Sequence, residues 1–204
     1  EYTCASDPDS SPFRLCDVTF YHGPRAVPAT TGTLRDISSA TSVYLTFTDQ
    51  KNGVRGERIG HCRSQDATAC PVLALVRRVL HLRAHHAPPT SPLYLVHTAN
   101  RFIPIRSSAI TQALRVSASA TTSSLNIDPS RISARSLRAG GAMALLCAGI
   151  DTNIIRLVGR WRSDEMLRYL HLQAQPIMQR FARLMVTHGD YHLLPNSNVL
   201  PPPG

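Results

Sequence analysis

Apolar and polar residues alternate along two stretches in the first third of the chain, and this alternation predicts β-strands. The first stretch covers residues 15–21 and the second covers residues 43–48. Asn52 and Gly53 follow the second stretch, and this dipeptide is the strongest short signal for a hairpin turn. The pattern therefore predicts one separate strand and then a β-hairpin over residues 42–61.

Later in the chain, apolar residues recur at helical spacing. One helix is predicted to begin at Pro71, because proline suits a first helical turn, and to end before Pro88. Further helices are predicted over residues 106–118, 137–148, 152–158, 163–171 and 174–187. Residues 23–34 and the Ser/Ala/Thr-rich residues 117–124 are expected to form loops. The elements together predict an α+β fold, mainly helical, with a small antiparallel sheet.

Side-chain exposure can also be predicted from these patterns. In the 106–118 helix, Ile110, Ala113 and Leu114 are expected to face inward. In the helix that begins at Pro71, the arginines are expected to face solvent or DNA; they are Arg77, Arg78 and Arg83.

The charge balance indicates a polyanionic partner. The 204 residues carry a formal net charge of +9, with 22 Lys+Arg against 13 Asp+Glu. Nucleic acid is the first expectation and an anionic membrane surface the second. No apolar run approaches the ~18 residues that a membrane span needs, so no span is predicted.

The five cysteines show no paired spacing, which fits an intracellular, reducing compartment. Cys16 and Cys147 lie in apolar segments and are expected to be core thiols. His61, Cys62 and Cys70 are candidate zinc ligands by residue type, but no further ligand completes a set. No metal and no cofactor is predicted.

Lys51 is the only lysine in the chain, and it lies beside the predicted hairpin turn. An arginine guanidinium cannot release its proton, whereas a lysine ammonium can. Lys51 at a hairpin tip is therefore either a solvated surface residue or a proton donor directed at a phosphate ester.

Three segments in the C-terminal half contain residues suited to phosphate chemistry. Arg135 and Arg138 are three positions apart, so at a helix start they share a face toward which backbone N–H groups also point. Trp161 and Tyr169 follow. A phenol, with a pKa of about 10, attacks poorly unless cations surround it, and the two arginines would provide that field. Taken singly, each residue is also compatible with a structural role.

The three segments and Lys51 together resemble the tyrosine recombinase (phage integrase) family, over roughly residues 1–187. Arg138, in the string Ser-Leu-Arg-Ala-Gly-Gly, matches the family's second catalytic arginine. Lys51 matches its hairpin lysine, and Tyr169 matches its nucleophile. Trp161 fits the family's His/Trp position by residue type and Arg160 fits it by spacing to the tyrosine; we favour Trp161. The Gly-Arg-Trp and Arg-Tyr strings look most like integrases of eukaryotic tyrosine-recombinase mobile elements.

The resemblance implies a tyrosine-recombinase catalytic-domain fold over residues 1–190, with a disordered tail at 191–204. It implies site-specific recombination or integration of double-stranded DNA through a 3′-phosphotyrosine intermediate, in the nucleus if the source is eukaryotic and otherwise in the cytoplasm. DNA contacts are expected from Arg55, Arg160, Arg162 and His171, although His171 equally suits a capping or surface role. The apolar stripe of the 174–187 helix is expected to dock on a neighbouring protomer, giving a homo-oligomer on DNA.

Two departures from the family pattern support a rival hypothesis. Arg135 stands where the family has histidine, and arginine cannot act as a general base. The family's first catalytic arginine would lie just upstream of Glu1 and Tyr2, so we expect the domain to be N-terminally truncated and this fragment to be inactive alone. The rival is a catalytically inactive DNA-binding remnant of a mobile-element integrase.

Overall fold

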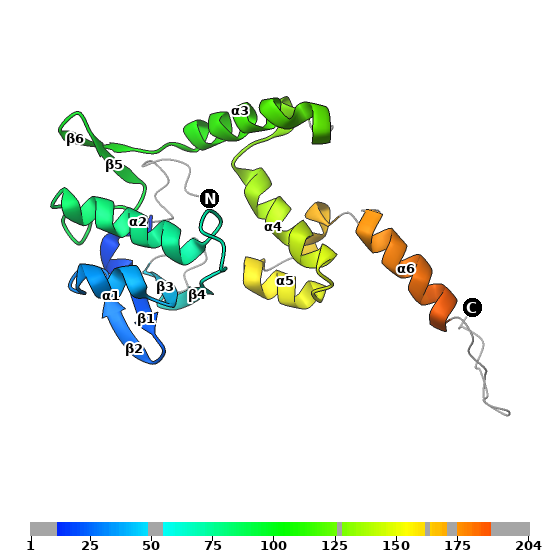
Figure 1. The fold of residues 1–204 in the computed structure, drawn as a ribbon, viewed down its shortest axis with the longest axis horizontal. Coiled ribbons are helices and arrows are strands. Elements are labelled where there is room, and N and C mark those ends of the chain that lie inside the picture. The colour runs from blue at the N-terminus through cyan, green and yellow to red at the C-terminus, as the bar shows by residue number, and fades with distance from the viewer. Residues whose placement is uncertain (1–11, 49–54, 126–127, 162–163, 171–174, 189–204) are drawn as a thin grey trace. The chain divides into compact units, whose positions relative to one another are not determined.

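The chain divides into two compact units, residues 1–133 and 134–204 (Figure 1). The structure is a computed structural model. It describes residues 12–48, 55–125, 128–161, 164–170 and 175–188. Helices and small antiparallel sheets make up the described residues, which confirms the α+β class.

A four-stranded antiparallel sheet forms the base of the first unit, in the order β2-β1-β3-β4. Its strands are β1 (Val18–His22), β2 (Arg25–Pro28), β3 (Ser42–Phe47) and β4 (Glu57–Cys62). Phe20 in β1 lies opposite Val27 in β2 and Val43 in β3. The pairing of β3 with β4 confirms the predicted hairpin, whose tip, with Lys51, lies outside the described residues.

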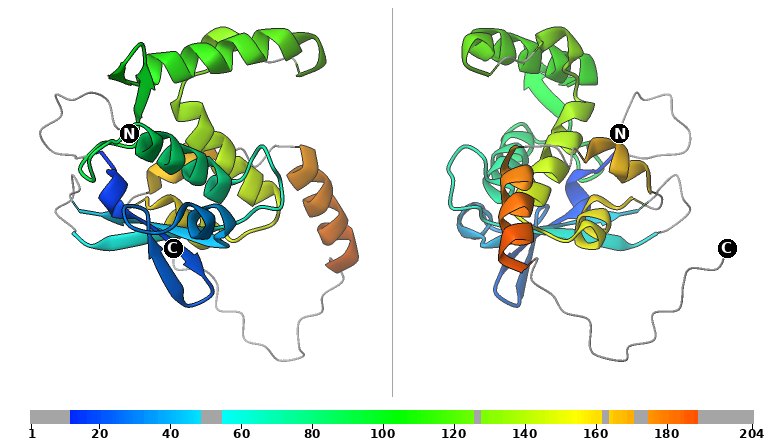
Figure 2. Two further views of the ribbon diagram at one scale, coloured as in Figure 1. Left: turned by 60° about the vertical axis from the view of Figure 1, so that its left-hand side comes forward. Right: turned by 90° about the vertical axis from the view of Figure 1, so that its right-hand side faces the viewer.

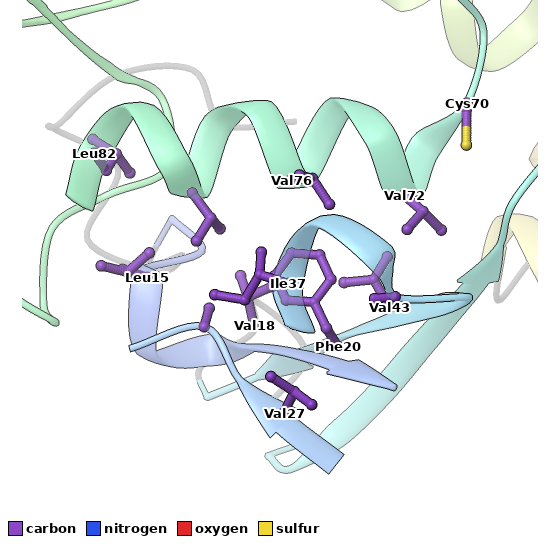
Figure 3. Packing of buried hydrophobic residues seen from close by; sticks show 13 residues of the cluster. Leu15, Val18, Phe20, Val27, Ile37, Val43, Cys70, Val72, Val76 and Leu82 are labelled. Atoms are coloured by element: carbon purple, nitrogen blue, oxygen red, sulfur yellow. The ribbon is translucent and has the colours of Figure 1, made fainter. Parts of the chain in front are cut away.

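Two helices, α1 (Leu34–Ser39) and α2 (Pro71–Ala84), cover one face of this sheet (Figures 1 and 2). Alternate strand residues face them, so Val18, Phe20 and Val43 are buried while Thr19 and Tyr44 are not. Figure 3 shows the resulting core, with the apolar side of α2 above the strands. The α2 residues in it are Val72, Val76, Val79 and Leu82.

The other elements of the first unit are η1 (Leu15–Asp17), the hairpin β5 (Leu95–Thr98) and β6 (Arg101–Pro104), α3 (Ser107–Leu125) and η2 (Pro129–Arg131). The second unit contains α4 (Arg135–Cys147), α5 (Thr152–Gly159), η3 (Asp164–Tyr169) and α6 (Gln175–His188). None of the described helices is long and apolar enough to cross a membrane.

The first strand begins later than its alternating pattern predicts, because Asp17 closes a turn ahead of it. Asp17 is buried, and its carboxylate accepts the Arg14 backbone N–H at 2.8 Å and Arg14 Nε at 3.2 Å. These bonds favour the 3₁₀ turn η1 over an extended chain. The strand therefore starts at Val18.

The predicted loops at 23–34 and 117–124 are both partly wrong. Within the first, residues 25–28 form β2, and Thr33 begins α1 by accepting the Asp36 N–H on its hydroxyl. Within the second, α3 continues to Leu125. There Ser119 and Thr121 donate to carbonyls four residues back, so their hydroxyls are compatible with the helix.

Several predictions of burial are also wrong. Cys16 and Cys147 are exposed, and of the four cysteines in the described residues Cys70 is the buried one. In α3, Ile110 and Ala113 are exposed and Leu114 is only half-buried. Both errors come from inferring that a side chain is buried because it is apolar. Folded proteins also expose many apolar side chains.

Three arginines of the first unit, Arg63, Arg83 and Arg115, each donate hydrogen bonds to two backbone carbonyls. Arg83 Nη1 donates to Gly32 at 2.6 Å and to Ala29 at 3.3 Å, so the prediction that it faces solvent or DNA is wrong. Arg63 donates to the carbonyls of Ala40 and Ser38, at 2.7 Å each. Arg115 donates to the carbonyls of Ile132 and Ser130, at 2.9 Å each. The guanidinium fork suits this task, because its donors are fixed in one plane.

Replacing Arg83 with methionine should lower the free energy of unfolding by about 1–3 kcal/mol, because the Ala29 and Gly32 carbonyls lose their partner. Arg35→Met is the control, since Arg35 is an exposed arginine of α1. Urea unfolding midpoints measure both variants. Equal midpoints for the two variants would show that the Arg83 bonds add nothing to stability.

Candidate functional site

A small core in the second unit holds α4, α5 and η3 together. Ala142, Ile155 and Met166 are its buried members, one from each element. Four half-buried side chains pack against it, from Leu145, Leu146, Trp161 and Leu170. This core fixes the backbone of the segments that carry four of the five predicted catalytic residues, namely Arg135, Arg138, Trp161 and Tyr169.

The helix α4 begins at Arg135, so the expected placement of two arginines in a first turn is found. Arg135 and Arg138 are both exposed. The N-cap residue is Ala134, which has no side-chain acceptor for the first-turn amides. The positive end of the helix dipole therefore adds to the charge of the two guanidiniums.

Arg138 and Trp161 lie against each other. The guanidinium carbon of Arg138 is 4.3 Å from the centre of the Trp161 ring, within the range of a cation–π interaction. Arg138 Nη2 also donates to the Gly159 carbonyl at 2.6 Å. The two contacts hold the guanidinium beside the ring, and one bond leaves most of its five N–H donors for a ligand.

The turn that ends α5 brings Trp161 to this position. Arg160 takes the left-handed conformation, with φ 57° and ψ 41°, and caps the helix. The N–H groups of Arg160 and Trp161 donate to Leu157 and Arg156, at 3.1 and 3.0 Å, so the chain reverses over the last helical turn. Arg160 therefore makes the turn, while Trp161 contacts Arg138.

The Trp161 ring lies on Gly159, and this contact requires glycine. A Cβ atom built at Gly159 would overlap the six-membered part of the ring. Gly159 thus serves the site twice, through its missing side chain and through its carbonyl. This role was not predicted from the sequence; the available signal was a glycine two residues before the tryptophan.

Of the remaining predicted site residues, the structure describes some and leaves others outside the described ranges. The backbone of Tyr169 belongs to η3, between the buried Met166 and the half-buried Leu170, but its side chain lies outside the described part. Lys51, Arg162 and His171 also lie outside the described residues. Arg55 is exposed and precedes β4 in the first unit.

No arrangement of His, Cys, Asp and Glu suited to a metal ion occurs in the described ranges, which include His61, Cys62 and Cys70. Comparisons of the chain with protein-family models, with curated proteins and with solved structures found no match.

Gly159→Ala should push the Trp161 ring off α5 and separate it from Arg138. Trp161 is the only tryptophan, so its fluorescence reports this site alone. We expect a red-shifted emission and easier acrylamide quenching.

Gly140→Ala in α4 is the matched control, because a Cβ there meets nothing within 4 Å. Its emission should be unchanged, and the helix should gain up to about 1 kcal/mol of stability. Identical spectra for Gly159→Ala and the native chain would refute the packing requirement.

Proposed function

We propose that this chain is the catalytic part of a DNA strand-transfer enzyme that cleaves and religates double-stranded DNA through a 3′-phosphotyrosine. The observation that supports this most is the Arg138–Trp161 pair, held on the same small core as the Tyr169 backbone. A guanidinium fixed by a ring and a carbonyl is suited to bind non-bridging phosphate oxygens bidentately.

In the proposed reaction the Tyr169 phenolate oxygen attacks a DNA phosphorus and the bond to the 5′ oxygen breaks. Arg138, with Arg135 on the same helix turn, stabilises the charge on the phosphoryl oxygens. Lys51 gives its proton to the leaving 5′ oxygen. The phosphotyrosine ester keeps the bond energy, so religation to another 5′ hydroxyl needs neither metal nor nucleotide.

Trp161 orients the phosphate in this proposal, and the neighbouring cations bind the DNA on either side. Arg160 and Arg162 flank the tryptophan in sequence, His171 follows the nucleophile, and Arg55 lies two residues before β4. These four side chains would contact DNA phosphates.

The last helix supports an oligomeric form on DNA. Its described side chains include four large apolar residues that are 40–68% exposed, namely Met178, Phe181, Leu184 and Met185. A helix with so much exposed apolar surface is suited to pack on another protein surface. A neighbouring protomer is the partner that we propose.

The second candidate function is a catalytically inactive DNA-binding protein with the same basic surface. Arg135 favours it, because an arginine at this position binds phosphate but cannot exchange a proton. The two candidates predict different results in the following experiments.

Tyr169→Phe in the full-length protein should abolish covalent protein–DNA adducts while DNA affinity stays nearly constant, because the phenol oxygen contributes little to binding. Nicked suicide duplexes with a randomised cleavage region, analysed on denaturing gels, measure the adduct. Tyr44→Phe is the control, since Tyr44 is a surface tyrosine of β3. An adduct that persists in the Tyr169→Phe variant excludes Tyr169 as nucleophile, and no adduct with the native protein favours the inactive candidate.

Lys51→Ala should slow strand cleavage by roughly 10²-fold, the lower range for loss of a general acid. Lys51→Arg keeps the positive charge without a transferable proton, so it should be almost as slow. A DNA substrate with a bridging 5′ sulfur needs no proton on its leaving group and should restore both rates. Full activity of Lys51→Arg on ordinary DNA would instead make Lys51 a phosphate contact.

A further inference from the structure

A second basic site lies in the first unit, on the solvent side of α2. Ala74, Arg77, Arg78 and His81 line an open pocket of about 230 Å³ together with Val96 of β5. These α2 positions are three or four residues apart, so they form a stripe on the helix. None of the described residues that line the pocket is acidic.

Both arginines are oriented by backbone carbonyls. Arg77 Nη2 donates to the Ala67 carbonyl at 3.2 Å, and Arg78 Nη1 donates to the Leu95 carbonyl at 2.9 Å. Each bond uses one of five N–H donors, so both guanidiniums keep donors for a ligand. Arginines that are already ordered lose less side-chain entropy when an anion binds.

His81 also lines the pocket. Its Nε2 accepts the His97 backbone N–H at 2.9 Å, so the ring proton is on Nδ1. Burial, followed by the neighbouring His85 and Arg78, lowers the pKa of His81. The His81 ring meets His85 edge-on, and His85 stacks on His97 with centroids 4.0 Å apart.

The groups that face His81 are therefore cations or imidazoles, from α2 (Arg78 and His85) and from β5 (His97). No carboxylate contributes to its pKa shift. An anion in the pocket would offset the repulsion between the charges of Arg77 and Arg78, and guanidiniums bind phosphate through charge-assisted hydrogen bonds.

We propose that Arg77, Arg78 and His81 form a phosphate-binding site, which takes a phosphate group of nucleic acid or of a smaller phosphorylated molecule. The ligand class follows from two fixed guanidiniums and one imidazole around an open, carboxylate-free pocket. The site goes beyond the proposed function, because none of these residues belongs to the strand-transfer site.

The experiment is an NMR titration of the full chain with inorganic phosphate, at neutral pH and at an ionic strength kept constant with sodium chloride. The signals to follow are the Arg77 and Arg78 side-chain N–H groups and the His81 ring. They should shift and saturate, whereas the exposed Arg35 should not respond. Equal responses to phosphate and to chloride would overturn the proposal.

Two substitutions at Arg77 and one elsewhere test the assignment. Arg77→Gln should weaken phosphate binding about tenfold, as loss of a charge-assisted contact does, and Arg77→Lys should weaken it less. Arg35→Gln removes the same charge from α1 and should have no effect. Equal weakening by Arg77→Gln and Arg35→Gln, with Arg77→Lys as tight as the native chain, would show that phosphate senses only net charge, and would refute the site.

A duplex oligonucleotide distinguishes the two sources of phosphate. If it moves the Arg77 and His81 signals and competes with inorganic phosphate, the ligand is the DNA backbone. If only inorganic phosphate moves them, the site takes a small phosphorylated molecule. Either result is independent of Tyr169, so Tyr169→Phe leaves it unchanged and failure of the strand-transfer proposal is recognised separately.

Discussion

The candidate site of the second unit depends on one steric constraint, the contact of the Trp161 ring with the bare Cα of Gly159. Because the ring lies there, its face is available to the Arg138 guanidinium, and the carbonyl of the same glycine accepts a hydrogen bond from that group. The left-handed Arg160 makes the reversal possible. One turn of three residues thus sets the position of a charge carried by another helix.

In each of the two basic sites, one in each unit, a backbone carbonyl accepts a hydrogen bond from an arginine and orients it. Arg138 is oriented by the Gly159 carbonyl, and Arg78 is oriented by the Leu95 carbonyl. Neither arginine has an ion pair with a carboxylate among the described residues. A carbonyl orients a guanidinium without neutralising it, so the positive charge stays available to an anion.

Local sequence patterns predicted the elements well where apolar spacing and turn residues decide the structure. The β3–β4 hairpin follows from strict alternation, and α2 follows from Pro71 and its valine spacing. The 3₁₀ turn at Asp17 escaped prediction because it depends on hydrogen bonds of one buried carboxylate. The late end of α3 escaped prediction because the Ser and Thr hydroxyls there bond to carbonyls of the same helix and do not end it. In the site, the arginine pair of α4 could be predicted from spacing. The support of Arg138 by Gly159 could not, because these residues are 21 positions apart and meet only through packing.

Some of the arginines that make the chain basic are bonded to backbone carbonyls of the first unit. Arg63, Arg83 and Arg115 each bind two carbonyls within the fold, so part of the donor set of each guanidinium is used internally. Counterions screen the attraction between exposed cations and a polyanion, but they hardly weaken short bonds between a guanidinium and a carbonyl. Concentrated salt should therefore release any polyanion held only by exposed arginines, while the bonds from Arg63, Arg83 and Arg115 to backbone carbonyls persist.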